Sequence, residues 1–168
     1  MTGASGGGYN TWITAALDDR IKVAVPVVGS DDFALKLRVH REFQFSGGYD
    51  HCHFPAGLIR FANNHELLAM IAPRPLLVVS ATADARFPIA GVRELARYGG
   101  ALYGSMGASE RFGFVEDQVT GHDYARKKRE AAYGWFLKWL LGRGDGSPFP
   151  ETASSTLPYD SPQLRCLP

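Results

Sequence analysis

The run Leu76-Leu77-Val78-Val79-Ser80 constrains the fold more than any other stretch of this 168-residue chain. Four consecutive aliphatic residues with no polar alternation are typical of a strand that is buried on both faces, as in a parallel sheet. Two further strands are predicted at 21–28, which is mostly β-branched, and at 111–116. Helices are predicted at 9–17, 31–38, 66–71, 90–103 and 125–141. This alternation predicts an α/β fold with a mostly parallel sheet wrapped by helices.

The chain divides into a predicted core, residues 1–141, and a tail, residues 142–168. The core ends in a helix whose apolar positions follow helical spacing, so these side chains are predicted to pack inward. The tail is rich in Gly, Pro and Ser and has little to bury, so we expect it to lie on the surface or to be disordered. Its Arg143-Gly144-Asp145 tripeptide matches an adhesion motif, but three residues in a Gly-rich segment arise easily by chance.

Charge and composition argue against two classes of partner. The formal net charge is +1, and the basic run Arg126-Lys127-Lys128-Arg129 opens an apolar-striped segment, so we expect a solvated helix face and no nucleic acid. No apolar run approaches the ~18 residues that cross a bilayer, so no membrane partner is expected. Cys52 and Cys166 are far apart and form neither a disulfide framework nor a CxxC site.

The segment Gly3-Ala4-Ser5-Gly6-Gly7 fits G-x-S-x-G, a strand-to-helix turn that holds a nucleophilic serine in a strained conformation. Side chains two residues before and after the serine would collide, so we expect both positions to require glycine. The turn places the Oγ of Ser5 near a helix N-terminus, where the helix dipole favours developing negative charge. The N–H of Gly6 is then a predicted oxyanion donor.

A serine nucleophile needs a base, and the base needs a carboxylate that orients it. Asp84 follows the buried strand at 76–80, and His122 follows the next strand in a Gly-His loop before the last helix. Functional groups of α/β sheets gather at such strand ends. The order Ser5, Asp84, His122 therefore predicts a catalytic triad of nucleophile, acid and base.

Several alternatives remain open at these positions. Asp31 or Asp32, after the strand at 21–28, is the alternative acid. The segment His51-Cys52-His53 offers metal-ligand residue types, but it has no second ligand pair elsewhere, so we expect no metal. The remaining histidines lack a matching strand-end loop and are expected to be structural or to contact substrate; they are His40, His51, His53 and His65.

The long excursion between the strands at 21–28 and 76–80 is aromatic-rich. Loops at this end of such a sheet form the substrate groove, so some of its rings are expected to line a pocket beside Ser5. The excursion holds Phe33, Phe43, Phe45, Tyr49, Phe54 and Phe61. We select Phe33, Phe54 and, from the loop of the predicted acid, Phe87 as substrate-binding candidates.

Several segments resemble the acetyl-xylan-esterase-like α/β-hydrolases, which are related to the prolyl-oligopeptidase and dienelactone-hydrolase groups. The resemblance covers about residues 1–141. It rests on the segments Gly3–Gly8, Ala15–Ile21, Ala72–Leu77, Asp84–Pro88 and Gly121-His122. The chain departs from the family pattern at Ala85 and Arg86, where proline and an apolar residue are expected.

The resemblance implies a three-layer α/β-hydrolase fold, of which this chain is the C-terminal half. It implies Ser5 as nucleophile, Asp84 as acid and His122 as base in the hydrolysis of carboxylic esters through an acyl-enzyme, without a cofactor. The substrate would be a small-molecule or carbohydrate ester, with acetyl esters as one possibility. The alternatives are a serine peptidase of the prolyl-oligopeptidase type and a non-catalytic remnant that acts as an interaction domain.

The position of the motif leads to a further expectation. The family has strands before the strand-to-helix turn at Gly3–Gly7, which is called the nucleophile elbow, and one of their loops supplies a second oxyanion donor. Here only Met1-Thr2 precede Gly3. We therefore expect weak activity at best from the isolated chain. We also expect an exposed sheet edge at 21–28, through which the chain could form a homo-oligomer.

Overall fold

The computed structural model describes residues 1–43, 57–152, 157, 158 and 160–165, and within these an α/β core is formed. Helices and strands alternate along the chain, with short 3-10 turns at Leu58–Arg60, Ser109–Arg111 and Pro162–Leu164. The main elements are β1 (Thr2–Ala4), α1 (Gly6–Leu17), β2 (Val25–Val27), α2 (Phe33–Phe43), α3 (Asn64–Ile71), β3 (Leu76–Ala81), α4 (Ile89–Ser105), β4 (Phe112–Asp117) and α5 (Arg126–Leu141).

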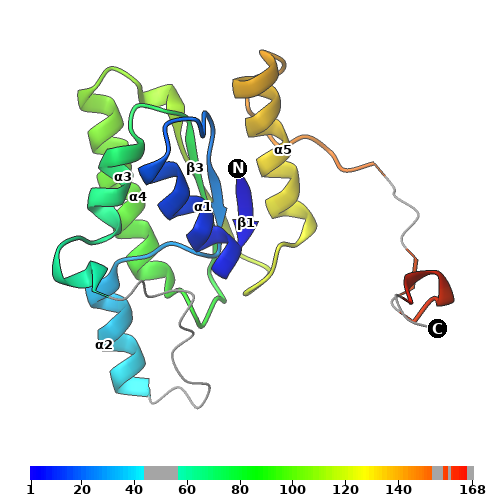
Figure 1. Ribbon diagram of the computed structural model, residues 1–168, viewed down its shortest axis with the longest axis horizontal. Coiled ribbons are helices and arrows are strands. Elements are labelled where there is room, and N and C mark those ends of the chain that lie inside the picture. The colour runs from blue at the N-terminus through cyan, green and yellow to red at the C-terminus, as the bar shows by residue number, and fades with distance from the viewer. Residues whose placement is uncertain (44–56, 153–156, 159, 166–168) are drawn as a thin grey trace.

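The sheet has four parallel strands in the order β1-β2-β3-β4. Helices α1, α3 and α4 cover one face, and α5 lies on the other (Figure 1). All six residues of β3 are buried, as the unbroken apolar run predicts. Alternate side chains of β3 enter different cores: Leu76 and Val78 pack with α1, α3 and α4, whereas Leu77 and Val79 pack with α5. The predicted three-layer α/β architecture is confirmed.

The structure corrects the expectation that no strand precedes the elbow. Thr2–Ala4 form the short strand β1, which pairs with Val25–Val27 of β2. Strand β2 therefore lies between β1 and β3, and the outer strand on this side is β1. Pro26 interrupts the β2–β3 ladder because it has no N–H. On either side of it, Leu77 N donates to Ala24 O and Val28 N donates to Val79 O.

Arg74 joins three segments that meet at the amino-terminal side of β3. Its guanidinium donates to the carbonyls of Ala15 at 2.6 Å, Asp18 at 3.1 Å and Ile21 at 2.9 Å. The hydroxyl of Tyr103 in α4 donates to the carbonyl of Arg74 at 2.6 Å. The Pro-Arg-Pro segment thus satisfies carbonyls at the end of α1, where the helix itself offers no partner.

The chain after α5 turns back along this helix. Gly142 ends α5 in the left-handed conformation with φ 61°, and the N–H of Phe149 then donates to the carbonyl of Glu130 at 2.9 Å. A side chain at Gly134 would collide with the returning backbone at Ser147, which explains glycine inside the helix. Helix α2 reaches Phe43, five residues beyond the predicted end. None of the helices in the described part of the chain is long and apolar enough to span a bilayer.

Candidate active site

Parallel strands bring their carboxyl ends to one edge, and the predicted catalytic residues follow three of the four strands there. Ser5 follows β1, Asp84 lies in the loop after β3, and His122 lies in the loop after β4. The loop after β2 carries Asp31 and Asp32. The sheet topology therefore collects at one edge residues that lie up to 117 positions apart in sequence.

Ser5 has the strained backbone that the motif predicts. Its φ of 57° and ψ of −120° lie outside the regions that L-residues favour, and such strain is typical of functional sites. The strand-to-helix turn is held by hydrogen bonds from Ser5 N to the carbonyl of Val27 and from Tyr9 N to the carbonyl of Ser5. Gly6 is the first residue of α1, so its N–H has no acceptor within the helix and is available to an oxyanion.

The glycines of the elbow have different steric roles from those expected. A Cβ on Gly3 would lie 2.6 Å from the backbone of Gly7, so the first glycine of the motif is required. A Cβ on Gly7 would meet nothing within 4 Å, so the expectation of a collision there is wrong. Gly8 takes that role instead, because its Cβ would lie 2.4 Å from the carbonyl oxygen of Val27. Gly29 is equally confined, with Ser5 O and Tyr9 N at 2.7 Å from its Cβ position.

Ser5, His122 and Asp84 form a continuous hydrogen-bonded chain. The Oγ of Ser5 lies 2.8 Å from Nε2 of His122, and Nδ1 of His122 lies 2.9 Å from Oδ2 of Asp84. The side chain of Asp84 is fully buried, whereas that of His122 is 24% exposed. This arrangement lets Asp84 hold the imidazole with Nε2 facing the serine, and it leaves the histidine open to an approaching substrate.

The acid is fixed by its own loop. Its Oδ1 accepts hydrogen bonds from the N–H groups of Arg86 at 2.8 Å and of Phe87 at 3.1 Å. The Phe87 ring is buried and stacks on His122, with the ring centroids 5.8 Å apart and the planes 6° from parallel. The loop therefore supports both the carboxylate and the imidazole, although residues 85 and 86 depart from the family pattern.

The histidine loop is held from α5 by Lys128, which corrects the interpretation of the basic run as a solvated face. The side chain of Lys128 is fully buried. Its Nζ donates to Oγ1 of Thr120 at 2.6 Å, to the carbonyl of Gly121 at 3.0 Å and to Oδ1 of Asp123 at 2.6 Å. Asp117, at the end of β4, accepts hydrogen bonds from the N–H groups of Val119 and Thr120. The residues on both sides of His122 are thereby fixed.

The alternative acids occupy other roles. Oδ1 of Asp32 accepts the N–H of Leu35 at 2.7 Å, so this carboxylate caps the start of α2. Its Oδ2 lies 3.7 Å from Nδ1 of His65. Asp31 is buried and lies 3.7 Å from Nζ of Lys36. The hydrogen bond to Nδ1 of His122 comes from Asp84.

The substrate-binding candidates divide into buried rings and undescribed residues. Phe33 is buried and packs near Tyr9, with ring centroids 6.0 Å apart, and Phe87 is buried against His122, so neither ring presents a free face to substrate in this structure. Phe61 is 86% exposed. The predictions for Phe54 and for His51-Cys52-His53 lie outside the described residues. In the described part of the chain, no group of three or more His, Cys, Asp or Glu side chains could hold a metal ion.

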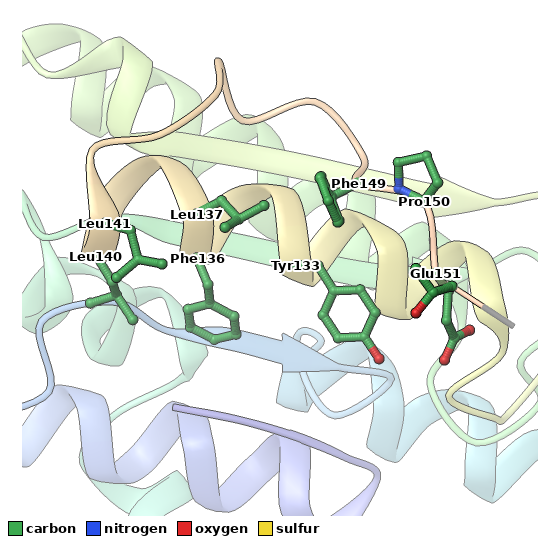
Figure 2. A pocket seen from close by; sticks show the side chains of 9 residues that line it. Tyr133, Phe136, Leu137, Leu140, Leu141, Phe149, Pro150 and Glu151 are labelled. Carbon is green, nitrogen blue, oxygen red and sulfur yellow. The ribbon is translucent and has the colours of Figure 1, made fainter. Parts of the chain in front are cut away.

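An apolar groove of about 600 Å³ lies away from these residues, between α5 and the returning tail (Figure 2). Leu137 and Phe149 face each other across it, and Phe136 points toward the sheet. The groove is lined by Tyr133, Phe136, Leu137, Leu140, Leu141, Phe149, Pro150, Glu151 and Thr152. Its lining does not include Ser5, Asp84 or His122, so it is separate from the candidate active site.

Comparisons with known proteins agree with this architecture. No protein-family model matches the chain. The chain is 31% identical over 138 residues to the "Putative hydrolase YtaP" of Bacillus subtilis (strain 168), a match that covers 82% of this chain and 44% of that protein. In the solved structure of the methylesterase BT1017, 83% of this chain matches 29% of that protein with a TM-score of 0.59 and 29% identity.

A third match concerns the fold. A carbohydrate esterase family 15 glucuronoyl esterase from Caldicellulosiruptor kristjansonii superposes with a TM-score of 0.69 at 18% identity, and the match covers 94% of this chain and 47% of the esterase. The chain spans less than half the length of each of these three proteins. The parallel sheet, the strand-to-helix turn at Ser5 and these similarities show that the chain has an α/β fold of the hydrolase type.

Proposed function

We propose that this chain carries the nucleophile, base and acid of a serine hydrolase that cleaves carboxylic esters through an acyl-enzyme. The observation that carries the proposal is the hydrogen-bonded path from Ser5 through His122 to the buried Asp84. A nucleophile within hydrogen-bond reach of a base, with the base oriented by a third group, is the geometry that activates a serine hydroxyl.

The first half of the reaction forms the acyl-enzyme. Nε2 of His122 takes the proton from Oγ of Ser5 as Oγ attacks the ester carbonyl carbon. The carboxylate of Asp84 stabilises the resulting imidazolium through Nδ1–H. The N–H of Gly6 donates to the oxyanion of the tetrahedral intermediate. His122 then gives its proton to the leaving alcohol as the C–O bond breaks.

The second half returns the enzyme to its starting state. A water molecule attacks the acyl-enzyme carbonyl while Nε2 of His122 accepts its proton, and the acid product leaves as Oγ of Ser5 is protonated again. Asp84 keeps the imidazole oriented in both halves of the reaction, because its carboxylate accepts from the N–H groups of Arg86 and Phe87 and from Nδ1 of His122.

The proposed substrate is a carboxylic ester of a carbohydrate. The name of one similar protein describes a methylesterase and that of another a glucuronoyl esterase, and the sequence itself resembles acetyl-xylan-esterase-like hydrolases. These esters differ in which side carries the sugar: an acetyl ester transfers a small acyl group, whereas a uronate ester transfers the sugar acid itself. Hydrolysis rates on an acetylated sugar, a methyl uronate and a prolyl amide separate these two ester classes from each other and from a peptidase.

The test of the mechanism is covalent labelling with a fluorophosphonate probe, followed by kinetics on the preferred ester. Ser5→Ala should abolish labelling and turnover while leaving the circular dichroism spectrum unchanged. His122→Ala and Asp84→Asn should each lower kcat by about 10³-fold or more. Asp32→Asn is the matched control, because it alters a carboxylate of the neighbouring loop that caps α2, and kcat should stay within a few-fold of wild type.

Two results would contradict the proposal. A folded wild-type protein that neither reacts with the probe at Ser5 nor hydrolyses any of the esters would favour a non-catalytic interaction domain. A silent Asp84→Asn together with an inactive Asp32→Asn would move the role of the acid to the loop after β2.

A further inference from the structure

The sheet order places the nucleophile and the base beyond opposite outer strands of the four-stranded sheet. Ser5 follows β1, whereas His122 lies in the loop after β4. Neighbouring strands lie about 4.8 Å apart, so three intervals separate β1 from β4 by about 14 Å. The loop after β4 must therefore cross the carboxyl ends of β3 and β2 to bring Nε2 of His122 to 2.8 Å from Oγ of Ser5.

A hydrogen bond joins this loop to β1. The hydroxyl of Tyr124, in the loop, lies 2.8 Å from Oγ1 of Thr2, in β1. Oγ1 of Thr2 also donates to the carbonyl of Val25 at 2.7 Å. A threonine hydroxyl has a single proton, so Tyr124 is the donor and Thr2 is the acceptor between the two hydroxyls. Burial raises the pKa of the Tyr124 hydroxyl, which keeps its proton in place at neutral pH.

The backbone of Tyr124 is fixed from α5 and from the returning tail. Nη1 of Arg129 donates to the carbonyl of Tyr124 at 2.6 Å. The same guanidinium donates to both carboxylate oxygens of Glu151, from Nε at 3.1 Å and from Nη2 at 2.7 Å. Glu151 is itself anchored on α5, because its N–H donates to Oε1 of Glu130 at 3.0 Å. The tyrosine hydroxyl therefore extends from a fixed backbone and can set the distance between the loop and β1.

The Tyr124–Thr2 contact lies close in sequence to both reacting groups. Tyr124 follows His122 by two residues, and Thr2 precedes Ser5 by three. A displacement of the loop away from β1 would therefore lengthen both the Tyr124–Thr2 contact and the distance from the base to the nucleophile. Lys128 holds the loop to α5 through acceptors within the loop itself, whereas Tyr124 holds it to the strand that precedes the nucleophile.

We propose that Tyr124 and Thr2 are positioning residues, which hold the base loop against β1 and so set the separation of Nε2 of His122 from Oγ of Ser5. The inference rests on the proposed function, since it assigns the two hydroxyls to the same proton transfer. That transfer requires the two atoms to be within hydrogen-bond distance. A small misplacement of one reacting group lowers the rate of such a step strongly.

Two single variants remove the contact from either side. Tyr124→Phe removes one hydroxyl and keeps the ring, and Thr2→Val removes the acceptor and keeps the side-chain shape. Each should lower kcat on the preferred ester about three- to tenfold at unchanged KM, because the contact acts on the proton transfer and not on ester binding. The rate of fluorophosphonate labelling at Ser5 should fall by a similar factor, since labelling uses the same activated hydroxyl.

Conservative and double variants separate positioning from a general loss of stability. Thr2→Ser keeps the hydroxyl and should retain the wild-type kcat. The double variant Tyr124→Phe/Thr2→Val should lose about as much kcat as the more impaired single variant, because both changes remove one contact. Tyr103→Phe is the matched control, since its hydroxyl donates to the carbonyl of Arg74 at the amino-terminal side of β3. This variant should have a lower urea midpoint, while the folded protein keeps the wild-type kcat and labelling rate.

The outcomes distinguish failure of this inference from failure of the proposed function. Full kcat in Tyr124→Phe, a Thr2→Ser variant as slow as Thr2→Val, or an equal loss of kcat in Tyr103→Phe contradicts the positioning role. A folded wild-type protein that neither reacts with the probe nor hydrolyses the esters contradicts the proposed function. The contact is then tested by the exchange of the Nδ1 proton of His122 with water, measured by NMR. This exchange should be faster in Tyr124→Phe than in the wild type, and equal rates contradict the inference.

Discussion

Lys128→Met tests whether a buried lysine of α5 holds the histidine loop. Methionine keeps most of the apolar volume but removes the ammonium and its hydrogen bonds to Thr120, Gly121 and Asp123. The carboxylate of Asp117, which is 1% exposed and lies 3.6 Å from Nζ, then remains buried with one charge fewer opposite it. Removing one partner of a buried ion pair costs about 3–5 kcal/mol of unfolding free energy.

Urea unfolding followed by tryptophan fluorescence measures this cost. With a urea slope of about 2 kcal/mol per molar, the expected loss lowers the midpoint by about 1.5–2.5 M. The catalytic rate should also fall below that of the wild type under conditions where both proteins are folded, because the loop that Lys128 holds carries His122. The variant therefore tests stability and positioning in one protein.

Lys127→Met provides the matched control. Lys127 is the preceding residue of α5 and is exposed, so the same substitution there should change the free energy of unfolding by no more than about 0.5 kcal/mol. Equal midpoints for the two variants would refute the reasoning, because they would show that the ammonium of Lys128 contributes no more than a solvated one.

Three further predictions follow from the described contacts. Gly8→Ala should lower the urea midpoint and the rate of probe labelling, because its Cβ would lie 2.4 Å from the carbonyl of Val27, whereas Gly7→Ala, with nothing within 4 Å, should be neutral or stabilise by about 0.5–1 kcal/mol. Arg74→Met should cost about 2–3 kcal/mol in the same assay, since three carbonyls at the end of α1 and before β2 lose a charged donor. Burial raises the pKa of Asp31 to about 7. The contribution of Asp31 to stability is therefore fully present below its unfolded pKa near 4 and is lost as pH rises toward 7. The melting temperature of Asp31→Asn should not fall with pH over this range.

The layers of the fold could be predicted because a strand that is buried on both faces has an unbroken run of apolar residues. The aliphatic run of β3 has no polar face, and the stripe of α5 repeats with helical spacing, so pattern alone identified both. Strand β1 has three residues, too few for any periodicity, and it is recognised only through its pairing with β2.

In the candidate site, the triad residues could be predicted from the sequence, whereas the aromatic residues around them could not. Ser5, Asp84 and His122 could be placed together because each follows a unit of a βα alternation, and parallel topology brings strand ends to one edge. The aromatic candidates could not be placed in this way. In a sequence, an aromatic residue is equally consistent with a buried position and with a contact to substrate. Phe87 is buried against the imidazole, where it supports the histidine.

The lysines show most clearly that a sequence pattern does not predict which charged side chains are buried. Lys127 and Lys128 are adjacent in one basic run, yet one is solvated and the other is fully buried under the loop of His122. The difference depends on acceptors that reach Lys128 from outside its helix, namely Thr120 and Asp123 in the loop after β4. Lys36 is likewise buried, and its neighbours Asp31 and Phe87 lie in two other loops. A sequence motif identifies the residues that are predicted to react. The residues that hold them in place come from other segments, so they become visible only once the fold brings a buried charge next to its partners.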